Sequence, residues 1–185
     1  MFYRQQELAA KQLELLVEAF PDSKRIAVLW DSISEDTFRS AEQFAQSMSL
    51  PLSPFKLEHP PYDFGAAFKI VAQSEPKALL VLSSPLFTSH RARIAELALQ
   101  YRLPTMFIFK TYVEAGGLMS YGVDLAVMYQ RAASYVAKIL RGAQPADLPV
   151  DQADKFHFAL NLKAAKALGI ALPTSILLRA DEVTE

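Results

Sequence analysis

Residues 78–109 read ALLVLSSPLFTSHRARIAELALQYRLPTMFIF, and this stretch decides the fold class. It opens and closes on continuous apolar runs, at 78–82 and 105–109, which are typical of strands buried on both faces of a parallel sheet. Between the runs, apolar residues recur at helical spacing from Ile94 to Tyr101, and Pro104 stands where that helix must already have ended. The stretch therefore predicts two parallel strands joined by a helix.

The same alternation extends in both directions along the chain. Three more strands are predicted at Arg25–Trp30, Leu52–Leu57 and Leu118–Tyr121. The second of them contains Pro54 and is expected nearer a sheet edge. Helical patterns precede the first strand and follow the first two. The sequence predicts an α/β fold with a doubly wound, mostly parallel, five-stranded sheet.

The last third of the chain has a different pattern. Asp124 is placed to cap a long helix, Leu125–Arg141, which Gly142 ends. Its apolar residues form two stripes, and two stripes indicate a helix that is covered on both sides. The first stripe is Met128, Ala132, Tyr135 and Ile139, and the second is Tyr129, Ala133, Val136 and Leu140. A connector with two prolines, an extended stretch at Phe156–Leu160 and a short helix closed by Gly169 follow.

Composition excludes several classes of function. The chain has 19 Lys and Arg against 20 Asp and Glu, so nothing in its charge drives it toward nucleic acid. It has no Cys, and its 3 His residues are not at metal-ligand spacing, so neither a metal site nor a thiol nucleophile is predicted. Its 6 Gly residues form neither a dinucleotide-binding nor a phosphate-binding loop, and no cofactor is predicted.

The start of the sequence carries no targeting signal. It lacks the basic region, apolar core and cleavage site of a secretory signal peptide. No apolar run reaches the roughly 18 residues of a membrane span. Taken alone, these features predict a soluble intracellular chain.

Polar and aromatic residues stand at the predicted strand ends. Ligands of open α/β sheets bind beyond the carboxyl ends of the strands, where the strand order reverses. The mixture of hydroxyls, a carboxylate and aromatic faces suits a small polar or zwitterionic solute with an apolar side. The predicted ligand-binding residues are Trp30, Asp31, Ser32, Ser83, Ser84 and Tyr121. In the alternative interpretation, Trp30 caps the core and Asp31 and Ser32 only start a helix.

A receiver domain would share this architecture, but it needs an aspartate at the end of the third strand. Ser83 and Ser84 stand there instead, and Lys110 follows the fourth strand rather than the fifth. The receiver interpretation is therefore rejected.

Several motifs together resemble the substrate-binding proteins of a widespread bacterial ABC transport family, some of whose members bind aromatic amino acids. The motifs are YVEAGGLMSYG at 112–122, PADLPV at 145–150, NLKAAKALG at 161–169 and RADEV at 179–183. The resemblance covers nearly the whole chain. Members often have Asn where Asp31 stands and an acid where Ser84 stands, so the resemblance does not name the solute.

The resemblance implies one lobe of a periplasmic-binding fold, a three-layer α/β/α sandwich. It implies a second-lobe domain, 1–123 plus 150–185, and a crossover helix and connector, 124–149, that would pack on a first lobe that this chain lacks. The implied function is solute recognition for an ABC importer, without catalysis, in partnership with an ABC permease. The implied location is periplasmic or membrane-associated.

Two other functions stay open. The chain could be a stand-alone sensory or interaction module that forms a homodimer through Leu125–Arg141, because a helix face without its partner lobe is an association surface. It could also be an enzyme of small-molecule metabolism that uses Asp31 and Ser84.

Overall fold

The computed structural model describes residues 5–23, 25–149 and 155–185. Its strands are β1 (Ile26–Asp31), β2 (Leu52–Leu57), β3 (Ala78–Val81), β4 (Thr105–Phe107), β5 (Met119–Val123), β6 (Phe156–Asn161) and β7 (Glu182–Thr184). Its helices are α1 (Gln5–Ala19), α2 (Glu35–Ser47), α3 (Phe64–Gln73), α4 (Pro85–Ser89), α5 (Arg91–Gln100), α6 (Lys110–Glu114), α7 (Leu125–Leu140), α8 (Leu162–Leu168) and α9 (Thr174–Arg179). Short 3₁₀ turns are η1 (Ser32–Ser34) and η2 (Pro145–Asp147).

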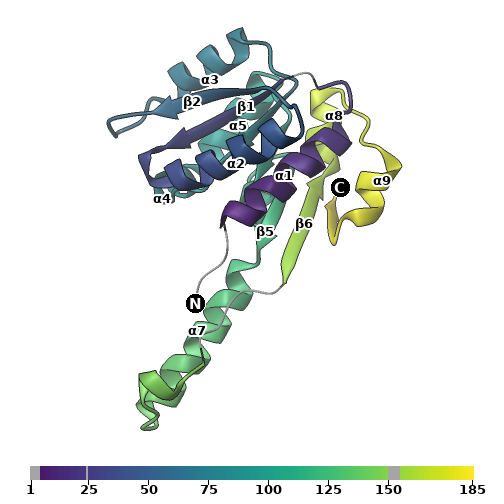
Figure 1. Ribbon diagram of the computed structural model, residues 1–185. Helices are drawn as coiled ribbons and strands as arrows, with labels where there is room; N and C mark the ends of the chain where they lie inside the picture. Colours follow the sequence, from purple (N-terminus) through teal and green to yellow (C-terminus); the bar gives the residue numbers. More distant parts are fainter. Residues whose placement is uncertain (1–4, 24, 150–154) are drawn as a thin grey trace.

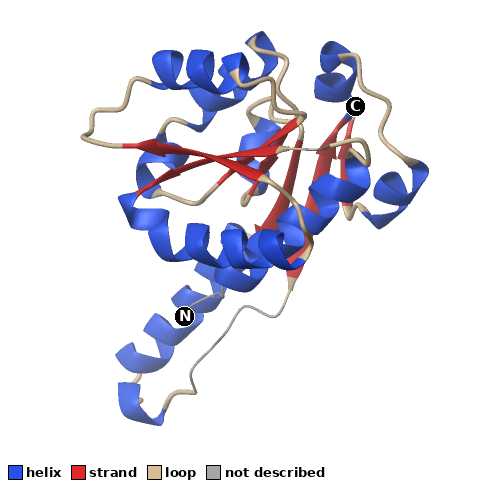
Figure 2. Ribbon diagram, turned by 45° about the horizontal axis from the view of Figure 1, so that its top comes forward, coloured by secondary structure: helices blue, strands red, loops and turns tan. Residues whose placement is uncertain are grey.

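One mixed sheet organises these elements, in the order β2-β1-β3-β4-β5-β6-β7 (Figure 2). Strands β1 to β5 run parallel to one another, and β2, which contains Pro54, lies at one edge as predicted. The order reverses at β1, since β2 and β3 lie on opposite sides of it. The carboxyl ends of β1 and β3 therefore flank the point where open α/β sheets bind ligands.

The prediction of five strands is too low, because the sheet has seven. Strand β6 pairs antiparallel with β5 along five residue pairs, and β7 pairs with β6. The extended stretch at 156–160 joins the sheet because Phe158 and Leu160 reach its core. Strand β7 has only three residues, Glu182–Thr184, and no apolar run, so no sequence pattern marked it.

Helices cover both faces of the sheet, which makes the predicted three-layer α/β/α arrangement (Figures 1 and 2). On one face, α1 and α2 pack over a core that includes Leu13, Leu16, Val28 and Leu80. On the other, α3, α5 and α6 pack over Leu29, Phe68, Ile94 and Phe107. Burial of this apolar surface is the main stabilising term of the fold.

Helix α7 projects away from the sheet (Figure 1). Asp124 caps it as predicted, accepting hydrogen bonds from the N–H groups of Ala126 and Val127, and Gly142 follows its end with a positive φ of 100°. None of its residues is buried. Its exposed large side chains include Tyr129 (72%), Val136 (55%) and Leu140 (82%), which belong to the second predicted stripe. The first stripe is better covered, and the Tyr135 hydroxyl donates to the carbonyl of Pro149 at 2.8 Å.

Candidate functional site

The carboxylate of Asp31 lies at the carboxyl end of β1, where the strand order reverses, and it is fully buried. Its Oδ1 accepts from the N–H groups of Ile33 and Ser34, both at 3.2 Å, and from the Ser34 hydroxyl at 3.1 Å. Its Oδ2 accepts from the Ser84 hydroxyl at 2.5 Å and from the Tyr62 hydroxyl at 3.3 Å. Five donors therefore converge on one buried carboxylate.

Tyr62 remains a donor to this carboxylate at neutral pH. Burial raises the pKa of the Tyr62 phenol above its usual value, and the charge and hydrogen bond of Asp31 raise it further. Through Ser84 and Tyr62, Asp31 joins the ends of β1 and β3 to the loop before α3.

The structure thus brings together two of the six predicted site residues, Asp31 and Ser84, and buries both completely. Ser32 is exposed beside them and Ser83 is half-buried. Whether a solute contacts these residues stays a prediction.

Trp30 and Tyr121 lie apart from this network. Because side chains alternate along a strand, Trp30 points to the α1–α2 face, where it stacks on Phe38 with ring centroids 4.4 Å apart. The ring of Tyr121 packs near Phe156 and Phe158 and against the cores on both faces of the sheet. The stacking of Trp30 on Phe38 is what the alternative interpretation of Trp30 as a core cap expects, and solute contact by Trp30 and Tyr121 stays a prediction.

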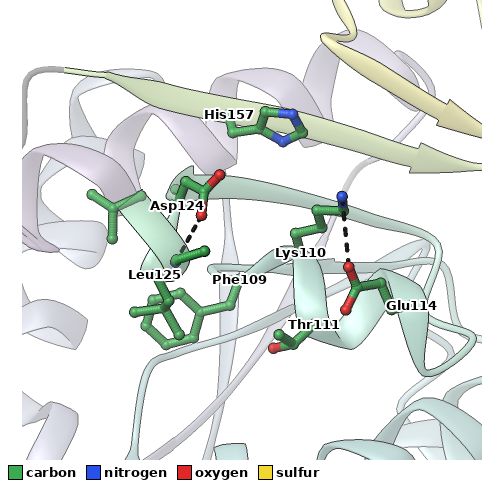
Figure 3. Close-up of a pocket in the computed structure, with 10 residues that line it drawn as sticks. Phe109, Lys110, Thr111, Glu114, Asp124, Leu125 and His157 are labelled. Atoms are coloured by element: carbon green, nitrogen blue, oxygen red, sulfur yellow. Dashed lines mark hydrogen bonds and ion pairs between the residues drawn. The ribbon is translucent and has the colours of Figure 1, made fainter. Parts of the chain in front are cut away.

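A hollow of about 260 Å³ lies further along the same edge, at the carboxyl ends of β4 and β5 (Figure 3). We call it the α6–α7 hollow, since it lies between the starts of these two helices. None of the six predicted residues lines it. Its lining residues are Phe109, Lys110, Thr111, Glu114, Gly122, Val123, Asp124, Leu125, Ala126 and His157.

The charged groups of the hollow stand on different elements. The Lys110 ammonium lies 2.7 Å from the carboxylate of Glu182 on β7 and 3.6 Å from that of Glu114. The hydrogen bond to Glu182 raises the pKa of Lys110 above its usual value, so Lys110 is an ammonium at neutral pH. Asp124 stands on the other side of the hollow, at the start of α7 (Figure 3).

Two polar atoms in the walls are buried without a hydrogen-bond partner among the described residues. They are Thr111 Oγ1 and His157 Nδ1. The other ring nitrogen of His157 lies 3.7 Å from Glu182. Unpaired buried polar atoms are rare in folded proteins, and two of them belong to residues that line this hollow.

The backbone approaches itself closely at the floor of this hollow. A Cβ added at Gly122 would lie 2.0 Å from the carbonyl oxygen of Ile108. Only glycine at position 122 therefore lets β5 lie this close to Ile108, in the segment that joins β4 to α6.

Sequence reasoning could have reached part of this hollow. Lys110 directly follows the fourth predicted strand, and Asp124 is a predicted helix cap. His157 and Glu182 carry no such signal, because they lie on β6 and β7. These strands come after α7 in the sequence and reach the hollow only by joining the sheet beside β5.

In residues 5–23, 25–149 and 155–185, no three His, Asp or Glu residues gather as metal ligands would. Within the same residues, no helix is long and apolar enough to cross a bilayer.

The sequence model of the ABC transporter substrate binding protein family matches residues 4–184. A conserved domain protein from Vibrio cholerae O1 biovar El Tor is 25% identical, with a TM-score of 0.85, covering 95% of this chain and 60% of that chain. A structure from Streptococcus pneumoniae, described as an ABC domain in complex with L-Trp, is 24% identical, with a TM-score of 0.83, covering 95% and 62%.

A third structure, the ligand-free, open form of a substrate-binding protein with adhesive properties from Clostridium difficile, has a TM-score of 0.64. It is 21% identical and covers 94% of this chain and 59% of that chain. The chain therefore spans about three fifths of the length of these solved proteins. No protein with a curated function matches the sequence.

Proposed function

This chain belongs to the ABC transporter substrate binding protein family, and on that premise we propose that it supplies one wall of a cleft that binds a small, amino acid-like solute. Binding is non-covalent and involves no catalysis. Closure of a second lobe over the solute would complete the site, as in hinge-closing binding proteins.

The α6–α7 hollow carries this proposal. It lies at the carboxyl edge of the sheet, where such folds bind ligands, and it combines an ammonium, carboxylates and apolar side chains in about 260 Å³. That combination suits a small molecule with both charged and apolar parts. One of its lining residues is Asp124, at which the chain leaves the sheet to form α7.

Partners and location follow from the family rather than from the site. We propose an ABC permease as the partner and a periplasmic or membrane-associated location. The protein from Streptococcus pneumoniae was solved with L-Trp, and its likeness to this chain is one of fold. L-tryptophan is therefore used below as a probe.

We predict that the 185-residue chain alone binds L-tryptophan with a Kd of roughly 1 mM, on the order of −4 kcal/mol. One wall buries less of a solute than a closed cleft and offers fewer polar groups. Isothermal titration calorimetry at high protein concentration measures this value. Micromolar binding would contradict the half-cleft interpretation.

A second proposal concerns assembly. We propose that two copies of this chain form a homodimer through α7, because Tyr129, Val136 and Leu140 leave a continuous apolar stripe exposed on a projecting helix. A two-fold contact would bury the same stripe on both copies. In this case the chain would be a stand-alone sensory or interaction module.

Replacing both Val136 and Leu140 with Asp is expected to convert the dimer to monomer, because fully burying each large apolar side chain contributes about 1.5–3 kcal/mol. The matched control is the double replacement of Gln130 and Ser134 with Asp, which has the same spacing but lies on another face of the helix. Sedimentation velocity measures the mass. A wild-type chain that sediments as a monomer at every concentration would show that the homodimer is wrong.

A further inference from the structure

We propose that the α6–α7 hollow binds the charged end of an amino acid zwitterion, with Lys110 holding its carboxylate and Asp124 its ammonium group. This inference rests on the proposed function, because it assumes that the carboxyl edge of the sheet binds a solute. It assigns an orientation to that solute, and it places the anchoring charges at residues other than Asp31 and Ser84.

Lys110 has donors left for a ligand. An ammonium group carries three N–H donors, and Glu182 at 2.7 Å takes one of them. The carboxylate of Glu114, at 3.6 Å, adds charge but is too far for a hydrogen bond. The paired side chains are more than a third exposed, and such ion pairs are weak. Lys110 can therefore turn toward a carboxylate in the hollow without losing a strong interaction.

Asp124 has an acceptor left for a ligand. Its Oδ1 accepts from the N–H groups of Ala126 at 2.8 Å and Val127 at 3.3 Å. Its Oδ2 accepts from no group among the described residues. Figure 3 shows Asp124 and Lys110 on opposite sides of the hollow, and the proposed solute lies between them.

The charge balance favours a zwitterion over a simple anion or cation. A lone anion beside Lys110 would also face the carboxylates of Glu114, Asp124 and Glu182, and a lone cation beside Asp124 would face Lys110. A zwitterion places each of its charges next to the opposite charge of the protein.

The rest of the hollow fits the same ligand. Phe109, Val123 and Leu125 provide an apolar wall for a side chain.

The test compares three probes that share the indole ring and differ in charge. L-tryptophan has both charges, tryptamine lacks the carboxylate, and indole-3-propionate lacks the ammonium group. Affinities for the 185-residue chain are measured by NMR titration, which detects weak binding. Wild type is expected to bind L-tryptophan at least about fivefold more tightly than either analogue, because only the zwitterion makes both charge-assisted contacts.

Two variants then assign each charge. Lys110→Met is expected to weaken L-tryptophan binding about tenfold and to leave tryptamine binding within about twofold, since tryptamine has no carboxylate to lose. Asp124→Asn retains helix-capping ability. This variant is expected to weaken the binding of L-tryptophan about tenfold and to leave the affinity for indole-3-propionate within about twofold, since that probe has no ammonium group to lose.

Matched controls lie away from the hollow. Asp63→Asn makes the same change at the cap of α3, where Asp63 accepts from the N–H of Ala66 at 3.0 Å, and Lys163→Met removes an exposed lysine of α8. Both are expected to bind all three probes as wild type does.

The possible failures are distinguishable. If wild type binds L-tryptophan but neither Lys110→Met nor Asp124→Asn weakens it, the zwitterion site is wrong and the proposed function stands. If wild type binds either analogue more tightly than L-tryptophan, the zwitterion site is also wrong. This comparison uses only the wild-type chain, so it does not depend on whether a variant folds. If wild type binds none of the probes and none of the other natural amino acids, the proposed function is itself wrong.

Discussion

Replacing Asp31 with alanine is expected to lower the free energy of unfolding by about 3–4 kcal/mol, among the largest effects of any single polar substitution in this chain. The carboxylate is fully buried and accepts five hydrogen bonds. Alanine would leave the buried Ser84 hydroxyl and the Ser34 N–H without their acceptor. Each buried donor left unpaired costs about 1–3 kcal/mol. Urea unfolding measures the loss.

The neighbouring Ser32→Ala is the control, because Ser32 is exposed and its change should stay within about 0.5 kcal/mol. If Asp31→Ala unfolds at the same urea concentration as Ser32→Ala, the buried network does not stabilise the fold.

Gly122→Ala is expected to destabilise the chain by about 3 kcal/mol, at the upper end of overpacking effects. The added Cβ would stand 2.0 Å from the carbonyl oxygen of Ile108 and 2.9 Å from its Cγ1. The obstacle is backbone, so either β5 or the chain entering α6 must move. The same movement would distort the α6–α7 hollow, which Gly122 lines.

Gly65→Ala is the matched control for this substitution. Its Cβ would meet only the flexible carboxylate of Asp63, at 3.3 Å, and alanine in a helix is favoured over glycine by about 0.5–1 kcal/mol. Thermal unfolding should therefore show a lower midpoint for Gly122→Ala and an unchanged or higher one for Gly65→Ala. Equal midpoints would mean that β5 does not need glycine.

The strands at the centre of the fold were predictable because burial on both faces leaves continuous apolar runs. Thus Ile26–Asp31 and Ala78–Val81 lie within a residue or two of the predicted ranges. Strand β7 was not predictable, since its three residues are half-buried or exposed and join the sheet only through β6. The cap at Asp124 was predictable because capping chemistry is local.

The candidate site was predictable only in part, for a related reason. The rule that ligands bind beyond strand ends leads to Asp31 and Ser84, but it does not show that these two residues hydrogen-bond each other. The α6–α7 hollow depends on residues far apart in the sequence. Lys110 meets Glu182 only because β6 and β7 return to the sheet after α7. No local pattern contains that information.

Titration of the ¹⁵N-labelled chain with L-tryptophan, followed by amide NMR, shows whether and where this chain binds the solute. If the carboxyl edge of the sheet is one wall of a solute cleft, shifts should saturate with a Kd of roughly 1 mM. They should be concentrated at residues 109–111 and 122–126, around the α6–α7 hollow. The absence of saturable shifts up to about 50 mM, tens of times that Kd, or shifts confined to β2 and α3, would contradict the claim.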